Sequence, residues 1–170
     1  MITRFLWGLA ICACTACALA NRAQSLPASD SARTSAVFVE RVRAYVTRQK
    51  DLDAGRIAAA RRDARQGDIF TPEVTEQFHT IVRKTFGGVE ARNMRRTILE
   101  GDPVTLTMLY VNEVFPEEIP RTTMPPTLLR HLPALPMELV YRIIGRALVL
   151  QDIKTSVIVD FIPDAIPQFR

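Results

Sequence analysis

Proline placement constrains this chain more than any other feature of its sequence. Seven of its eleven prolines fall between Pro103 and Pro136. Proline lacks a backbone N–H and its fixed φ interrupts helices and sheet ladders, so this stretch is predicted to contain no long regular element. The 170-residue chain is therefore divided into a part before the prolines and a part after them, each with its own secondary structure.

The part before the prolines has the periodicity of amphipathic helices. From Ser35 onward, apolar residues recur on one helical stripe and basic residues occupy the other side, which predicts a helix of about four turns. The segment 51–55 is a candidate break and 57–66 is helix-prone again, and the alternative is one long helix, since a single glycine costs only about 1 kcal/mol. The apolar stripe consists of Phe38, Val42, Tyr45 and Leu52.

Two further helices are expected before the first clustered proline. Thr71 can cap free backbone N–H groups and Pro72 suits the first helical position, so a helix is predicted to start there. Gly87 and the glycine after it end this helix. A shorter helix is expected over 89–100, and the helical part closes with the glycine that follows it.

The part that begins with the clustered prolines is typical of β-structure. Segment 104–115 is rich in β-branched residues and predicts one strand, and 125–132 predicts one or two helical turns. Three further strands are expected at 139–144, 147–151 and 157–162, joined by short turns. Short connections between consecutive strands favour a three-stranded antiparallel β-meander.

Helices first and strands later predict an α+β domain. The expected single domain covers 35–170 and follows a flexible lead-in at 21–34. Within the domain, 35–101 holds the amphipathic helices, 102–136 is the proline-rich connection and 137–163 is the β-meander. A chain of this length suits one domain that buries a core without disulfides.

The first twenty residues have the pattern of a secretory signal peptide. Arg4 supplies the positive start, and the apolar run from Phe5 to Ala20 carries no charge. This run is shorter than the roughly 20 residues that span a bilayer, and it ends in small residues that suit a signal peptidase. Cleavage of residues 1–20 is expected to give a periplasmic or secreted protein with no transmembrane segment.

All three cysteines, Cys12, Cys14 and Cys17, lie inside this apolar run. After cleavage the mature chain is cysteine-free, so it has no disulfide, no thiolate nucleophile and no cysteine metal site, and no cofactor is expected. The alternative is processing as a lipoprotein, with a lipid attached at Cys14 or Cys17. A lipid would anchor the protein at the membrane surface.

Charge is distributed unevenly along the chain. Residues 41–100 carry 13 basic and 8 acidic side chains, whereas 101–170 carry 6 and 8. The favoured interpretation is a solvated helix face with local ion pairs, and the alternative is an anionic partner, such as an envelope protein or an anionic envelope surface. Nucleic acid is not expected, since the aromatic residues fit apolar faces better than base-stacking positions. The candidate contact residues are Arg56, Arg61, Arg62 and Arg65.

Signatures of familiar catalytic and metal sites are missing from the sequence. It has no His-Glu-x-x-His zinc motif, no Gly-x-Ser-x-Gly elbow and no phosphate-binding glycine loop. His79 follows Glu76 at the spacing of one di-iron ligand pair, but a di-iron bundle needs two such pairs. His79 is therefore interpreted as a residue of the helix surface or boundary.

Carboxylates are the remaining candidates for catalysis. Two of them about 5–9.5 Å apart can hydrolyse a glycosidic bond, so a hydrolase that uses Asp152 or Asp160 is the enzymatic alternative. Asp160 interrupts the apolar run of the last predicted strand. The favoured interpretation places it toward solvent on a one-sided sheet, and the other interpretation buries it with Arg142 or Arg146.

Two stretches of the chain have a distinctive pattern. One is Ala-Arg-Arg-Asp-Ala-Arg-Gln-Gly-Asp-Ile-Phe-Thr-Pro-Glu-Val at 60–74. The other runs from Pro-Pro-Thr-Leu-Leu at 125–129 through Tyr-Arg-Ile-Ile-Gly-Arg-Ala-Leu-Val-Leu-Gln-Asp at 141–152 to Ile-Val-Asp-Phe-Ile-Pro at 158–163. Both resemble a family of exported bacterial proteins with no assigned activity, which implies export but no reaction. The strands at 141–150 are also similar to small periplasmic proteins linked to metal homeostasis.

These patterns favour a non-enzymatic exported protein that acts through contacts with a partner in the cell envelope. Two alternatives stay open: a hydrolase that uses carboxylates of the strand half, and a protein held at the membrane surface by its basic helices or by a lipid. The hydrolase hypothesis predicts that Asp152 or Asp160 lines a pocket and has a raised pKa.

Overall fold

The computed structural model describes residues 29–87, 91, 108–115 and 124–168 of the chain. The helices are α1 (Asp30–Gln49), α2 (Ala54–Ala60), α3 (Pro72–Gly87) and α5 (Pro126–Leu129). The strands are β1 (Leu139–Ile144), β2 (Ala147–Asp152) and β3 (Ile158–Ile162). Helices precede strands along the chain, which confirms the α+β class.

The three strands form one antiparallel sheet in the order β1-β2-β3, which confirms the predicted meander. Gly145 turns the chain between β1 and β2 with a φ of 54°, a left-handed conformation that glycine adopts without a steric penalty. β2 is the central strand and is buried along its whole length. A β-bulge interrupts the ladder between β2 and β3 at Leu150 and Gln151.

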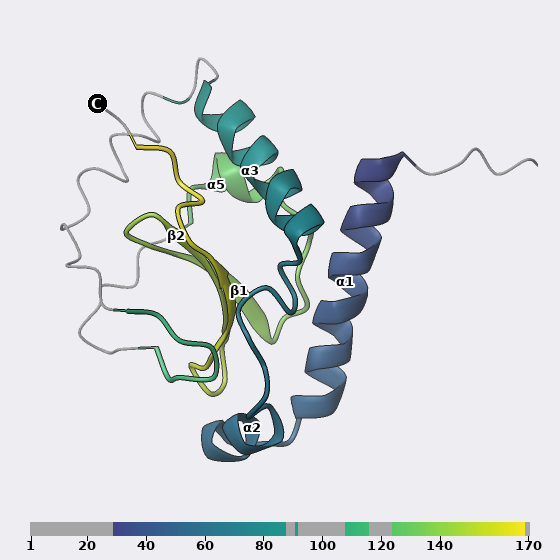
Figure 1. Ribbon diagram of the computed structural model, residues 1–170, viewed down its shortest axis with the longest axis vertical. Coiled ribbons are helices and arrows are strands. Elements are labelled where there is room, and N and C mark those ends of the chain that lie inside the picture. Colours follow the sequence, from purple (N-terminus) through teal and green to yellow (C-terminus); the bar gives the residue numbers. More distant parts are fainter. Residues whose placement is uncertain (1–28, 88–90, 92–107, 116–123, 169–170) are drawn as a thin grey trace, which may run out of the picture.

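The sheet has a helix-facing side and an outer side (Figure 1). Helices α1 and α3 lie over the first, and α2 follows at the end of α1. On the outer side, Val149 and Ile158 pack with Phe115 in a separate apolar cluster. Successive side chains of a strand point to opposite faces, so each strand contributes to both clusters.

A cluster of aromatic rings fills the space between the helices and the sheet. The ring of Phe38 in α1 is fully buried and lies 5.5 Å from that of Phe70 and 5.2 Å from that of Phe78, measured between centroids. Phe70 and Phe78 meet edge to face at 5.3 Å. The ring of Tyr141 in β1 lies beside both Phe38 and Phe78. These rings join α1, α3 and the sheet into one core.

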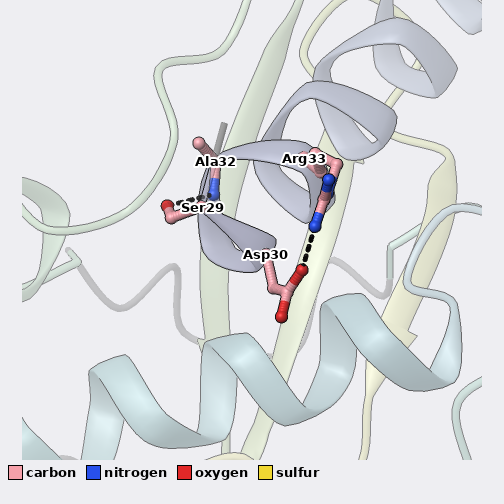
Figure 2. A network of polar contacts seen from close by, with 4 residues as sticks. All are labelled: Ser29, Asp30, Ala32 and Arg33. Atoms are coloured by element: carbon pink, nitrogen blue, oxygen red, sulfur yellow. Dashed lines mark hydrogen bonds and ion pairs between the residues drawn. The ribbon is translucent and has the colours of Figure 1, made fainter. Parts of the chain in front are cut away.

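Helix α1 begins five residues before the predicted start at Ser35 and takes in the end of the expected flexible lead-in. Ser29 caps the helix by accepting a hydrogen bond from the backbone N–H of Ala32 at 3.2 Å, and Asp30 pairs with Arg33 (Figure 2). A serine cap stabilises a helix by about 1 kcal/mol, and an acidic first turn suits the positive end of the helix dipole. These local contacts explain the earlier start.

Helix α2 is shorter than the predicted segment 57–66. It starts after Asp53, whose carboxylate accepts a hydrogen bond from the backbone N–H of Arg56 at 2.9 Å. It ends at Ala60, and Arg61 has left helical geometry with a φ of −116° and a ψ of 22°. The physical reason is tertiary, because the side chain of Arg61 binds partners on other elements, as described below.

The remaining helix predictions have different outcomes. Helix α3 runs from Pro72 to Gly87 as predicted, and the hydroxyl of Thr71 accepts a hydrogen bond from a first-turn N–H. Helix α5 supplies the helical turn expected within 125–132. The helix predicted over 89–100 lies outside the described residues, except for Ala91.

The strand predicted over 104–115 is wrong for its described part, residues 108–115. The chain turns at Asn112, whose φ of 70° is left-handed and incompatible with an extended strand. Val114 forms an isolated bridge with Val157 of the sheet. The apolar composition of this segment serves packing instead, since Phe115 is buried in the outer cluster.

Candidate functional site

A cavity of about 520 Å³ lies between α1 and the segment that follows α2. This size falls within the range of about 300–1,000 Å³ that is usual for ligand sites. We refer to it as the arginine-lined cavity. Helix α1 lines it with Arg41, Ala44, Tyr45, Arg48 and Gln49. The opposite wall includes Arg61, Asp63 and Asp68.

Arg61 is held in place by several partners. Its Nη1 donates to Oδ1 of Asn112 at 3.0 Å, and its Nη2 donates to the carbonyl oxygen of Val159 at 3.0 Å. Asn112 donates back to the carbonyl oxygen of Arg61 at 2.7 Å. The guanidinium carbon also lies 5.0 Å from the centre of the Tyr45 ring, a cation–π contact. Burial lowers the pKa of the guanidinium, although arginine stays protonated at neutral pH.

Arg41 and Arg48 bring two further cations to the α1 wall. They are seven residues apart, which is close to two helical turns, so they lie on one face. Arg41 donates from Nη1 to the carbonyl oxygen of Asp68. Within the described part of the chain, Arg48 has no hydrogen bond and no ion pair. Neither cation is neutralised by a carboxylate at ion-pair distance among these residues.

Gln49 adds an unused acceptor to the same wall. Only 8% of its surface is exposed, and its side-chain Oε1 has no hydrogen-bond donor among the described residues. Gln49 also lines a second cavity of about 30 Å³, together with Asp152 and Thr155. Gln49 is thus shared by the linings of both cavities.

Tyr45 connects the cavity wall to the sheet. Its hydroxyl donates to Oδ2 of Asp152 at 3.1 Å, and Oδ1 of Asp152 accepts from the backbone N–H of Thr155 at 2.9 Å. Burial, followed by the negative charge of Asp152 and the hydrogen bond to it, raises the pKa of the Tyr45 phenol well above its ordinary value. The positive charge of Arg61 opposes this rise. Asp152 thus links α1 to the turn between β2 and β3.

The buried tyrosines predict a loss of stability at alkaline pH. Burial raises the pKa of both Tyr45 and Tyr141 in the folded state, whereas an unfolded tyrosine has a pKa of about 10. The folded state keeps protons that the unfolded state releases. The free energy of unfolding is therefore expected to fall as the pH rises through this value, by up to about 1.4 kcal/mol per pH unit for each tyrosine. Urea unfolding at a series of alkaline pH values measures this slope.

Two phenylalanine variants check the origin of the slope. Tyr45→Phe is expected to remove about half of the tyrosine contribution, because each ring releases one proton on unfolding. The double variant with Tyr141→Phe is expected to remove nearly all of it. An unchanged slope in the double variant would show that the folded state does not hold these phenols protonated.

Asp160 is fully buried, so the favoured interpretation that it faces solvent is wrong. It lies on the helix-facing side of the sheet, opposite Leu150 of β2. Its Oδ1 accepts from the backbone N–H groups of Gly67 at 2.9 Å and Phe161 at 2.8 Å. Its Oδ2 accepts hydrogen bonds from the backbone N–H groups of Ile69 and Phe70, each at 2.8 Å. Both donors belong to the connection between α2 and α3.

The partners of Asp160 also differ from the alternative expectation of Arg142 or Arg146. Arg142 donates to Gln151 at 3.2 Å, and Arg146 pairs with Asp164 at 2.9 Å. Burial raises the pKa of the Asp160 carboxyl, and the four backbone N–H donors oppose that rise. Each oxygen already accepts two hydrogen bonds, so this carboxylate holds a loop in place and has no oxygen directed at a substrate.

The fold separates the four arginines predicted to meet an anionic partner. Arg61 is half-buried and lines the arginine-lined cavity, whereas Arg56, Arg62 and Arg65 are exposed. The structure thus groups Arg61 with the arginines of α1 instead of with its sequence neighbours. Sequence reasoning missed the two α1 arginines because it assigned them to the side of the helix away from the core. The sequence did contain one indication, namely their spacing of seven residues, which places both arginines on one face of the helix.

The other candidate groups form no recognisable site. His79 is partly exposed on α3, with its Nδ1 3.7 Å from Oε1 of Glu76. In the part of the chain that the structure describes, no group of three His, Cys, Asp or Glu side chains is placed to hold a metal ion. Among the described helices, none is both long and apolar enough to cross a membrane. The three cysteines lie outside the described residues.

Comparison with protein-family models, with curated proteins and with solved structures found no match. The arginine-lined cavity combines a ligand-sized volume with two cations, Arg41 and Arg48, that have no carboxylate at ion-pair distance among the described residues.

Proposed function

We propose that this protein is exported and acts without catalysis, by binding an anionic partner at the arginine-lined cavity. The signal-like segment 1–20 supports a periplasmic or secreted location. The observation that carries the binding proposal is the pair Arg41 and Arg48. Both line the cavity, and no described carboxylate lies within ion-pair distance of either.

The chemistry of guanidinium groups explains why such a pair favours binding. Arginine is weakly hydrated and presents a fork of N–H donors that matches carboxylate and phosphate oxygens. The basic helical half, with 13 basic and 8 acidic side chains in residues 41–100, adds a field that steers an anion toward the site.

The carboxylates of the strand half favour binding over hydrolysis. Both oxygens of Asp160 accept backbone N–H groups in the core. Asp152 accepts hydrogen bonds from Tyr45 and from a turn N–H, and it is not among the residues that line the arginine-lined cavity. Both carboxylates therefore have structural partners, which leaves the arginines as the better candidates for ligand contact.

Titration with poly-L-glutamate, followed by calorimetry, tests the proposal. Arg48→Glu is expected to weaken binding by at least about tenfold, because it removes a charge-assisted contact and adds repulsion. The matched control is Arg43→Glu, an exposed residue of the same helix that does not line this cavity, with an expected change of about twofold or less. Raising the salt from about 50 mM to about 200 mM is expected to weaken the wild-type interaction.

Two outcomes would contradict the proposal. Equal losses in the Arg48 and Arg43 variants would mean that the general charge of α1 binds the anion and that the cavity does not. Failure of the wild-type protein to bind the polymer at low salt would remove the proposed function altogether.

A further inference from the structure

The two cations of the α1 wall have a defined spacing. Arg41 and Arg48 are seven residues apart, which is about 10.5 Å of rise along the helix, and Ala44 and Tyr45 line the wall between them. In the polyproline II conformation, side chains three residues apart lie on the same side of the chain, about 9 Å from each other. The arginine spacing therefore suits two acidic side chains that are three residues apart in an extended peptide.

The size and location of the cavity favour such an extended peptide over bulkier partners. A helix with its side chains is about 10–12 Å wide, which is large for a cavity of about 520 Å³. A bilayer surface is flat, whereas this site lies between a helix and the loop that follows α2. An extended chain presents its side chains to a narrow site without these restrictions.

The opposite wall disfavours a polymer that carries phosphates and no hydrogen-bond donors. Asp63 and Asp68 line it, and their carboxylates repel a chain that carries only phosphates. A peptide supplies backbone N–H donors for these two carboxylates as well as side-chain carboxylates for the arginines, whereas a phosphate polymer supplies only acceptors.

We infer that the partner is another protein, which presents an extended acidic segment along α1 with two carboxylates, three residues apart, on Arg41 and Arg48. This inference rests on the proposed function, because it takes the arginine-lined cavity as the anion site. It adds the class of the partner and the spacing of its charges.

Two end-blocked hexapeptides of identical composition test the inference on the full chain. In one, glutamates occupy the first and fourth positions, and in the other the two glutamates are adjacent. Calorimetry is expected to show that the spaced peptide binds about tenfold more tightly, because only it engages both arginines. Arg48→Ala is expected to remove this preference, whereas Arg43→Ala keeps it. Far-UV circular dichroism confirms that each variant is folded.

The outcomes separate the inference from the proposed function. If poly-L-glutamate binds in an Arg48-dependent manner but the two peptides bind equally, the anion site stands and the spaced acidic segment is refuted. If phosphatidylglycerol vesicles or inorganic phosphate displace the spaced peptide at matched anion concentration, the partner is a phosphate-bearing surface and the inference fails. If neither the polymer nor the peptides bind, both fail.

Discussion

Replacing Asp160 by alanine is expected to lower the free energy of unfolding by about 3–5 kcal/mol, a large share of the stability of a small domain. The substitution removes the acceptors of the backbone N–H groups of Gly67, Ile69 and Phe70. A buried donor left without a partner costs about 1–3 kcal/mol, and the bonds to Ile69 and Phe70 are buried. Urea unfolding of the full chain measures the loss.

The matched control for Asp160→Ala is Asp164→Asn, four residues further along the chain. Asp164 forms an exposed ion pair with Arg146, so its loss is expected to cost no more than about 1 kcal/mol. Asparagine also tolerates the left-handed φ of 52° at this position. Similar losses in the two variants would contradict the role assigned to Asp160.

Replacing Phe38 by alanine is expected to lower the free energy of unfolding by about 3–5 kcal/mol, because it removes packing from the core. The ring is fully buried, and it stacks near the rings of Phe70, Phe78 and Tyr141. Its removal leaves a cavity where α1 meets α3 and the sheet. Because α1 also carries Arg41, partial release of this helix is expected to weaken anion binding together with stability.

The neighbouring residue provides the control for Phe38. Val37 is 42% exposed on the same helix, so Val37→Ala is expected to change the free energy of unfolding by less than about 1 kcal/mol. Urea unfolding and poly-L-glutamate titration of both variants give the two readouts. If Phe38→Ala were no more damaging than Val37→Ala, the packing of α1 on the sheet would have to be revised.

Local chemistry was sufficient to predict much of this fold. Pro72 starts α3 and Gly87 ends it, because proline suits the first helical turn and glycine the end of a helix. Gly145 marks the turn between β1 and β2, so the meander followed from short connections between apolar runs. The early start of α1 also depends on local contacts, namely the cap at Ser29 and the ion pair of Asp30.

The candidate site was much harder to predict. Arg61 was selected with its sequence neighbours, yet its guanidinium binds Asn112 and Val159, which are 51 and 98 positions away. Arg41 and Arg48 are exposed, as their place on the polar side of the predicted helix indicates, but the sequence did not show that they also line the arginine-lined cavity. Charge patterns along one helix do not indicate which other segment lies opposite, and that segment turns a basic face into one wall of a cavity.

The sequence by itself determined the order of helices and strands, because propensity, capping and turn chemistry act over a few residues. Only the tertiary structure decided the role of Asp160, whose partner Gly67 is 93 positions away. A carboxylate in an apolar strand is satisfied either by water or by buried donors, and nothing in its own strand distinguishes the two. The loop over 67–70 supplies the donors, so segments 60–74 and 158–163 meet at this residue. The long-range hydrogen bonds fix that loop, and with it the wall of the arginine-lined cavity.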